Sequence, residues 1–258
     1  MPPTTRRLAG KLALVTGASS GIGAATARAL AADGARLVLA ARRVERLAEL
    51  AQELAALGAA TEVLALDVRD ADATQRALAA LPLDIAVANA GLGLGLTKLP
   101  HGDPAAWATM IDTNVKGVLH TIRATLPGMN ARGAGDLVLV GSVAGRQVYP
   151  GGNVYNATKH AVRALYEALR LDNQGTGVRF TTVDPGMVET EFSLVRYGGD
   201  AEAARRVYQG MTPLSPADVA DAILYAVTRP PHVNIGELVL WPTAQASTRD
   251  VTRAPAAP

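Results

Sequence analysis

The feature that most constrains the fold is a glycine-rich turn between an apolar run and a helix-like segment near the start of the chain. Residues 11–16 are mostly apolar, residues 24–33 are rich in Ala and Leu, and Gly17, Gly21 and Gly23 lie between them. Gly17 permits a sharp turn, Gly21 lets a pyrophosphate approach the backbone, and Gly23 lets the helix pack closely on the strand. This order predicts a parallel α/β sheet with a dinucleotide phosphate at the start of the helix.

The rest of the chain continues the alternation of strand-like and helix-like segments without hairpin signals. Such an alternation is typical of a parallel sheet with both faces covered. No repeat, linker or composition shift divides the sequence, so we expect one domain over residues 1–258. The further expected strands cover residues 35–41, 62–66, 84–88, 136–141, 178–183 and 237–241. The expected helices cover residues 44–57, 71–80, 105–126 and 154–171, with a last helix beginning at Ser215–Pro216.

The composition excludes several classes of function. Hydrophobic residues make up 49% and charged residues 19% of the chain, and the net charge is 25 minus 23, or +2, with the signs interspersed. Nothing therefore indicates a nucleic-acid or membrane partner. The absence of cysteine and the scattered His101, His120, His160 and His232 argue against a metal site. With no apolar leader or run of eighteen apolar residues, we expect a cytoplasmic protein.

The end of the second expected strand indicates which coenzyme binds. An NAD enzyme of this architecture would place Asp or Glu there for the ribose 2′-hydroxyl, but the residue is Ala41, followed by Arg42 and Arg43. The missing carboxylate and the two guanidinium groups favour a 2′-phosphate, and hence NADP(H) over NAD(H). The alternative is that both arginines are a solvated start to the next helix, although cations there oppose the helix dipole.

Ligands of such folds bind where the parallel strands end. Asp67, Asn89 and Ser142 follow three of the expected strands and therefore fall on this edge. The pattern is irregular from Phe192 to Gly210, with a possible short helix over Ala201–Gln209. We expect a substrate lid at about residues 187–212. The segment of about residues 244–258 is rich in Ala, Thr and Pro and is expected to be a flexible tail.

Tyr155 and Lys159 place a phenol and an ammonium one helical turn apart. A cation at that distance would lower the pKa of the phenol towards a range useful for proton transfer. The same spacing recurs in Tyr166–Arg170 and Tyr225–Arg229, so the pair alone means little. Tyr155 differs because it begins the helix after the fifth strand, beside Ser142 at the ligand edge. The other two pairs are expected to be cations packed over partly buried rings.

Together these motifs resemble the short-chain dehydrogenase/reductase family over about residues 8–243. The resemblance implies a Rossmann-type doubly wound sheet of seven parallel strands in the order 3-2-1-4-5-6-7, and a homotetramer. One departure is Ala88, where a second Asn is commoner, and it should weaken one polar contact at most. The matching motifs are Thr16–Gly23, Asn89–Gly91, Asn114, Ser142, Tyr155 with Lys159, and Pro185–Gly186.

The resemblance also implies roles for individual residues. Tyr155 would exchange the alcohol proton, Lys159 would lower its pKa and bind the nicotinamide ribose, and Ser142 would bind the reacting oxygen. Asn114 would hold a water that connects Lys159 to solvent. The implied coenzyme-binding residues are Gly17, Ser19, Ser20, Gly21, Ile22, Gly23, Arg42, Arg43, Asp67, Val68, Asn89, Ala90, Gly91, Tyr155, Lys159, Pro185, Gly186, Val188 and Thr190. Val188 and Thr190 would contact the carboxamide.

Within the family, the chain is most similar to NADP-dependent 3-hydroxy acid dehydrogenases that oxidise serine and allo-threonine. The likeness lies in Met110–Gly117, Gly151–Tyr155, Thr190–Ser193 and Pro231–Ile235. It implies hydride transfer between the nicotinamide and a small substrate such as serine or 3-hydroxypropionate.

A 3-hydroxy acid needs a cation for its carboxylate, and Arg146 and Arg196 are the candidates, although each can equally be a solvated surface arginine. The alternative is a reductase of bulkier ketones or aldehydes, of the clavulanate or broad carbonyl type, whose pocket would include Leu94, Val148, Met187 and Phe192. A remote alternative is a non-catalytic NADP-binding regulator, but a regulator would not need an intact proton relay.

Overall fold

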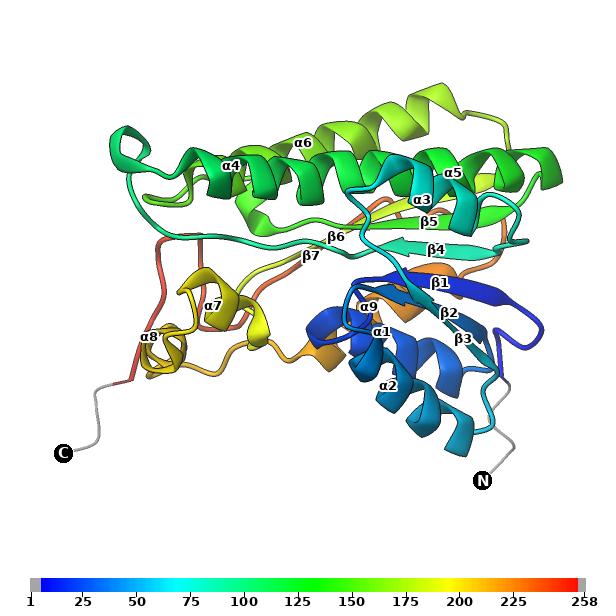
Figure 1. Cartoon of the computed structure of the whole chain (residues 1–258), viewed down its shortest axis with the longest axis horizontal. Helices are drawn as coiled ribbons and strands as arrows, with labels where there is room; N and C mark the ends of the chain where they lie inside the picture. Colours follow the sequence, from blue (N-terminus) through cyan, green and yellow to red (C-terminus); the bar gives the residue numbers. More distant parts are fainter. Residues whose placement is uncertain (1–5, 255–258) are drawn as a thin grey trace.

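A seven-stranded parallel sheet forms the centre of the computed structural model, which describes residues 6–254 (Figure 1). The strand order is β3-β2-β1-β4-β5-β6-β7, and every neighbouring pair is parallel. The predicted fold class and strand order are therefore confirmed. The strands are β1 (Leu12–Thr16), β2 (Arg36–Ala41), β3 (Thr61–Ala65), β4 (Ile85–Ala88), β5 (Gly135–Val140), β6 (Val178–Pro185) and β7 (Glu237–Leu240).

Helices cover both faces of the sheet. In Figure 1, α1, α2 and α9 lie on one face, while α3, α4, α5 and α6 lie on the other. The α-helices are α1 (Gly21–Ala32), α2 (Val44–Ala56), α3 (Ala71–Leu78), α4 (Pro104–Ile111), α5 (Gly117–Arg132), α6 (Asn153–Asp172), α7 (Glu191–Arg196), α8 (Ala201–Arg206) and α9 (Pro216–Val227). Shorter helical turns are η1 (Leu99–His101), η2 (Asp112–Lys116) and η3 (Val143–Gly145).

The central strands are unbroken apolar runs in the sequence because each face of these strands packs against a separate hydrophobic core. In β1, Ala13 and Val15 belong to the core under α1 and α9, whereas Leu14 belongs to the core under α5 and α6. Side chains alternate between the faces of a strand, so two covered faces require apolar residues at every position. This pattern is what allowed the strands to be predicted to within one or two residues.

The structure departs from the predicted helices in two places. The helix expected over residues 105–126 is interrupted by the π-helical turn η2 and extends to Arg132, where Gly133 ends it in the left-handed conformation. The helix α7, in a region that was expected to be irregular, begins at Thr190, whose hydroxyl accepts a hydrogen bond from the Phe192 N–H. The η2 turn and α7 both contribute residues, such as Thr113 and Phe192, to the ligand edge, whereas the extension to Arg132 lies at the opposite edge, where β5 begins.

Residues in the range 244–254 form hydrogen bonds with the rest of the protein, whereas a flexible tail was expected there. Gln245 is buried, and its Oε1 accepts a hydrogen bond from the Met187 N–H (2.9 Å). Further along, the Thr248 N–H donates to Gln147 and the Ala254 N–H donates to the Gly210 carbonyl. Residues 255–258 of the predicted tail lie outside the described residues. No helix within residues 6–254 has the length and apolarity to cross a membrane.

Candidate active site

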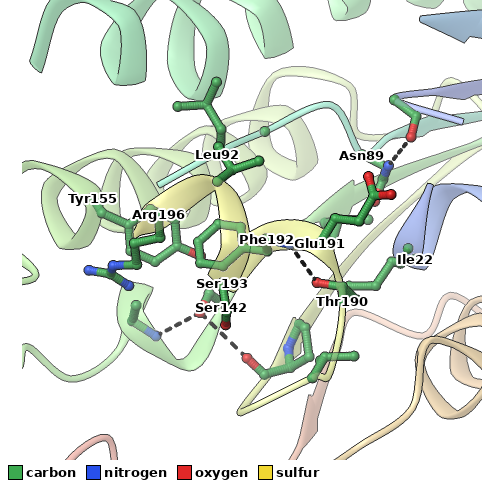
Figure 2. A pocket seen from close by; sticks show the side chains of 18 of the residues that line it. Ile22, Asn89, Leu92, Ser142, Tyr155, Thr190, Glu191, Phe192, Ser193 and Arg196 are labelled. Carbon is green, nitrogen blue, oxygen red and sulfur yellow. Dashed lines mark hydrogen bonds between the residues drawn. The ribbon is translucent and has the colours of Figure 1, made fainter. Parts of the chain in front are cut away.

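One cavity of about 670 Å³ lies at the carboxyl edge of the sheet, between the strand ends and α7 (Figure 2). Residues from the ends of β1, β2, β4, β5 and β6 line one side of it, and α7 lines the other. The cavity brings together most of the predicted site residues. The predicted residues that line it are Gly17, Ser19, Ser20, Gly21, Ile22, Arg42, Arg43, Asp67, Val68, Asn89, Ala90, Gly91, Ser142, Tyr155, Lys159, Pro185, Gly186, Met187, Val188, Thr190, Phe192 and Arg196.

The glycine turn is shaped to bring backbone close to a ligand. Gly17 has φ +66°, and a Cβ atom there would lie 2.9 Å from the Ala90 Cα. A Cβ atom on Gly23 would lie 2.4 Å from the Gly17 carbonyl oxygen, so α1 can pack on the turn only because this residue is glycine. Asn89 holds the turn by donating to the Thr16 carbonyl (2.9 Å). The turn therefore presents the N-terminus of α1 to the cavity, as a phosphate requires.

The two arginines after β2 differ in their contacts. Arg43 donates to the hydroxyls of Ser19 (3.2 Å) and Ser20 (2.7 Å), and it forms an ion pair with Glu191 of α7 (2.8 Å). Arg42 lines the cavity and makes no hydrogen bond or ion pair with any residue in the described part of the chain. The ligand edge therefore holds one guanidinium that is engaged and one that is available to an anion.

Asp67 is held by its neighbour in sequence. Arg69 donates to both carboxylate oxygens, with a shortest distance of 2.6 Å, and this contact lowers the pKa of Asp67 below its usual value. The carboxylate therefore lines the cavity in its ionised form.

Tyr155, Lys159 and Ser142 meet where β5 ends and α6 begins. Tyr155 is in the first turn of α6 and is 9% exposed, and the Lys159 Nζ lies 5.9 Å from the centre of its ring. Lys159 donates to the Val140 carbonyl (2.9 Å), which fixes the ammonium against the end of β5. The Ser142 hydroxyl caps η3 by accepting from the Ala144 N–H (3.1 Å), and it donates to the Pro185 carbonyl (3.4 Å).

Burial is the largest influence on the pKa values of Tyr155 and Lys159. Burial raises the pKa of Tyr155 well above its usual value, and the nearby Tyr149 adds to this, whereas Ser142 and Arg196 act in the opposite direction. Burial also lowers the pKa of Lys159 to about 8, partly offset by Asp184. The net direction for Tyr155 is the opposite of the prediction that Lys159 lowers its pKa. The reason is that desolvation of the phenolate outweighs the hydrogen bond from Ser142 and the attraction of Arg196.

Asn114 is buried inside η2 and does not point outward, as a mid-helix Asn usually does. Its amide accepts a hydrogen bond from the Leu92 N–H (2.8 Å) and donates to the Leu92 carbonyl (2.8 Å). It also donates to Thr158 of α6 (3.1 Å). The π-helical turn thus places Asn114 beside α6, and π-turns commonly occur at functional sites.

Arg196 extends from the end of α7 into the cavity beside Tyr155, as Figure 2 shows. Its guanidinium carbon lies 5.2 Å from the ring centres of both Tyr149 and Tyr155, and Nη1 donates to the Tyr149 hydroxyl (2.6 Å). Its Nη2 is buried and has no hydrogen-bond partner within residues 6–254. Phe192, one turn earlier on α7, packs against the Tyr155 ring with the centres 5.3 Å apart.

Three predicted substrate residues do not line the cavity. Arg146 is held by Asp184 and Glu237, so its guanidinium is already occupied by two carboxylates. Val148 is 63% exposed, and Leu94 packs in a small apolar cluster near Met110. The structure therefore contradicts their predicted place in the pocket. Arg146 was predicted wrongly because its guanidinium binds Asp184 of β6 and Glu237 of β7, although its neighbours Val143, Ala144 and Tyr149 line the cavity.

Sequence reasoning also missed several lining residues. Tyr149 and Tyr208 are partly buried aromatic residues in loops, and Gln245 and Thr248 come from the C-terminal segment. Tyr149 had a local signal, since it lies six residues before Tyr155 in the loop that leads into α6. No local signal identifies Gln245, because it reaches the cavity from a segment 58 residues beyond its partner Met187.

The other two tyrosine–cation pairs have the cation over the ring as expected, but neither ring is partly buried, because Tyr166 is 1% exposed and Tyr225 is 46% exposed. The Arg170 guanidinium lies 5.8 Å from the centre of the buried Tyr166 ring, and that of Arg229 lies 4.2 Å from the Tyr225 ring. Neither tyrosine lines the cavity.

Comparisons with known proteins agree with this geometry. The family model described as short chain dehydrogenase matches residues 11–196. The chain is 47% identical over 241 residues to "Sulfoacetaldehyde reductase 2" of Chromohalobacter salexigens, covering 91% of this chain and 95% of that protein. It is 44% identical over 241 residues to an NADP-dependent 3-hydroxy acid dehydrogenase of Escherichia coli, covering 91% and 96% of the two chains.

A solved structure described as the closed form of serine dehydrogenase complexed with NADP⁺ superimposes with a TM-score of 0.89. It is 42% identical in sequence, and the match covers 95% of this chain and 100% of the other. The family model, the relatives and the structural neighbour agree with one another and with the strand order. The chain therefore belongs to the short-chain dehydrogenase/reductase family of oxidoreductases.

Proposed function

We propose that this protein is an NADP(H)-dependent oxidoreductase that interconverts a small hydroxy acid, or a related anionic alcohol, with its carbonyl form. The observation that carries the proposal is Arg196, whose Nη2 is buried at the cavity without a partner within residues 6–254, beside the Tyr155 ring. A buried donor without a partner is costly, and an anionic oxygen of the substrate would satisfy it. The short distance to Tyr155 fits a substrate with few carbons between its anionic group and its reacting carbon.

The roles of the catalytic residues follow from their contacts. Tyr155 exchanges the proton of the reacting oxygen, and Ser142 donates a hydrogen bond to that oxygen. Lys159 supplies the positive charge that stabilises the phenolate as the proton leaves, and Asn114 orders the polar groups between Leu92 and α6. When bound, the nicotinamide supplies or accepts the hydride.

The coenzyme is bound by the turn at Gly17 to Gly23 and by the residues after β2. Ala41 leaves no carboxylate at the ribose position, and Arg42 is available to a 2′-phosphate. The NADP⁺ in the structural neighbour and the NADP dependence of the Escherichia coli relative support this assignment. Val188 and Thr190 line the cavity, which supports the contact with the carboxamide that we propose for them.

We also propose that residues 187–212 form a lid over the substrate, because α7 carries Phe192 and Arg196 to Tyr155. Membership of the family supports a cytoplasmic homotetramer. The serine dehydrogenase, hydroxy acid dehydrogenase and sulfoacetaldehyde reductase relatives support both carboxylates and sulfonates as the anionic group. The alternative, a reductase of bulkier ketones, is favoured by the apolar lining from Leu92, Leu96, Met187 and Phe192.

A substrate panel with one variant distinguishes these functions. The panel contains serine, 3-hydroxypropionate, 2-hydroxyethylsulfonate and a neutral secondary alcohol, each with NADP⁺ and with NAD⁺. Arg196→Met should lower kcat/KM for the anionic substrates about 10- to 150-fold, the loss of one hydrogen bond to a charged group, and change the neutral alcohol little. Arg205→Met, on α8 outside this cavity, is the matched control. An equal loss on all substrates would exclude an anion-binding role.

A further inference from the structure

Arg146 forms a partly buried ion pair with Asp184, close to Ser142. The Arg146 Nε and Nη2 atoms each lie 2.7 Å from the same Asp184 oxygen, and Nη2 also contacts Glu237 of β7. The Asp184 side chain is 3% exposed, and its second oxygen accepts a hydrogen bond from the Thr182 hydroxyl (2.8 Å). Burial opposes the charge on Arg146, but hydrogen bonds to Glu237 and Asp184 raise its pKa, so it stays a cation.

This ion pair joins the two segments that hold Ser142. Arg146 follows η3 directly, and Ser142 caps the start of that turn, which is closed by a hydrogen bond from the Gly145 N–H to the Ser142 carbonyl (2.8 Å). Asp184 directly precedes Pro185, whose carbonyl accepts from the Ser142 hydroxyl. The pair therefore fastens the turn that carries Ser142 to the end of β6 that receives its hydrogen bond.

The same pair is close to the backbone segments that hold Lys159. A Cβ atom on Gly145 would lie 2.5 Å from the Lys159 carbonyl oxygen, so η3 packs directly on α6. A Cβ atom on Gly141 would lie 1.9 Å from an Asp184 oxygen, so the carboxylate touches the backbone just after Val140. Val140 provides the carbonyl that binds the Lys159 ammonium. The negative charge of Asp184 attracts that ammonium and opposes the effect of burial.

The charged and titratable groups around Lys159 come from several elements. Tyr155 is on its own helix, Asp184 is on β6 with Arg146 and Glu237 behind it, and Arg196 of α7 lies across the Tyr155 ring. Asp184 is the carboxylate that acts on Lys159, and Arg146 sets how much of its charge is neutralised.

We propose that Arg146 and Asp184 are positioning residues of the proton relay, whose ion pair holds the Ser142 turn against β6 and keeps a carboxylate beside Lys159. The inference rests on the proposed function, which assigns the relay to Ser142, Tyr155 and Lys159. A positioning role also accounts for the absence of Arg146 from the cavity, although Arg146 is only four residues after Ser142 in the sequence.

The test is a titration of Lys159 by NMR in protein labelled with [ε-¹³C]lysine, which needs no substrate. The chain contains only four lysines, Lys11, Lys98, Lys116 and Lys159, so the signal is readily assigned with Lys159→Arg. Asp184→Asn keeps the shape of the side chain and removes its charge. We expect the Lys159 titration, near pH 8 in the unaltered protein, to fall by about half a unit or more.

The matched control is Asp136→Asn. Asp136 pairs with Arg179 (2.8 Å) and joins the same two strands at their opposite ends, so its loss should leave the Lys159 titration unchanged. Arg146→Met should raise the pKa of Lys159, because it leaves the negative charge of Asp184 without its cation. This variant also tests the proposal if Asp184→Asn does not fold. A Lys159 titration that is the same in the unaltered protein and in the folded variants would overturn the proposal.

Kinetics provide a second readout. Arg146→Met should lower kcat about 10- to 100-fold by misplacing Ser142. The Kd for NADPH should stay within about threefold of its value in the unaltered protein. Arg146→Lys should recover part of the lost kcat. Unchanged kcat in Arg146→Met would refute the positioning of Ser142. If the Lys159 titration shifts as expected but no alcohol on the panel is oxidised by the unaltered protein, the proposed function fails while the electrostatic part of this inference stands.

Discussion

Replacing Arg42 by Ala should separate the binding of NADPH from that of NADH. Arg42 lines the cavity just after β2 and is engaged by no hydrogen bond or ion pair within residues 6–254, so it can approach a 2′-phosphate without losing another contact. A hydrogen bond to a charged group contributes about 1.5–3 kcal/mol. We therefore expect the Kd for NADPH to rise about 10- to 150-fold in Arg42→Ala, while the Kd for NADH stays nearly constant.

Arg43 should contribute less, because Glu191 competes for it. The Arg43–Glu191 pair is half exposed, at 47% and 37%, and such pairs are worth at most about 1 kcal/mol. A 2′-phosphate that binds Arg43 must displace this carboxylate or bind beside it. Glu191→Gln should therefore tighten NADPH by up to about fivefold and leave NADH unchanged, since NADH has no phosphate at that position.

Coenzyme fluorescence titrations at two salt concentrations measure these effects. The loss in Arg42→Ala should shrink at high salt because salt screens exposed charges. Arg28→Ala, which removes an exposed ion pair with Glu53 on α2, serves as the control for a lost surface arginine. Equal weakening of NADPH and NADH in Arg42→Ala would refute a 2′-phosphate role. Weaker binding of both coenzymes in Glu191→Gln would mean that Glu191 holds the bound coenzyme in place and does not compete with it.

Two further predictions concern the proton relay. Tyr155→Phe keeps the packing against Phe192 and removes the proton carrier, so kcat should fall by about two to four decades while the Kd for NADPH is nearly kept; near-normal turnover would exclude Tyr155 as the acid and base. Burial lowers the pKa of Lys159 to about 8, so its positive charge is present below that pH and is lost above it. The kcat/KM for NADPH-dependent reduction should therefore be flat below about pH 7 and fall above about pH 8, and a flat profile up to pH 10 would contradict the part assigned to Lys159.

The fold was predictable because its signals are local and repeated. Strands such as β1 and β4 are apolar at every position, which indicates a sheet covered on both faces, and each is bounded by a glycine turn or a helix. The interruption at η2 was not predictable, because Asp112–Lys116 continues the helical pattern and the π-turn depends on the burial of Asn114 against Leu92. The helix α7 has only six residues, too few to produce a periodic pattern.

The candidate site was predictable where a residue follows a strand directly, as Ser142 follows β5. In a parallel sheet such positions share one edge whatever their separation in sequence. The contacts of long side chains were not predictable. Arg146 pairs with carboxylates 38 and 91 residues away, and nothing near it in the sequence reveals that its charge is neutralised. From the sequence, Arg196 and Arg146 were equal candidates for binding a substrate carboxylate, and only the structure distinguishes them.

The three tyrosine–cation pairs show why spacing alone does not define a relay. All three cations lie over their tyrosine rings, at 5.8 Å for Tyr166, 4.2 Å for Tyr225 and 5.9 Å for Tyr155. Lys159 differs because its ammonium also donates to the Val140 carbonyl at the end of β5. The cation nearer to the Tyr155 ring is Arg196 at 5.2 Å, and it belongs to α7. Since Arg196 lowers the pKa of Tyr155, any movement of α7 away from the cavity would make the phenolate harder to form. An enzyme built this way would remove the alcohol proton efficiently only when the proposed lid is in place over its substrate.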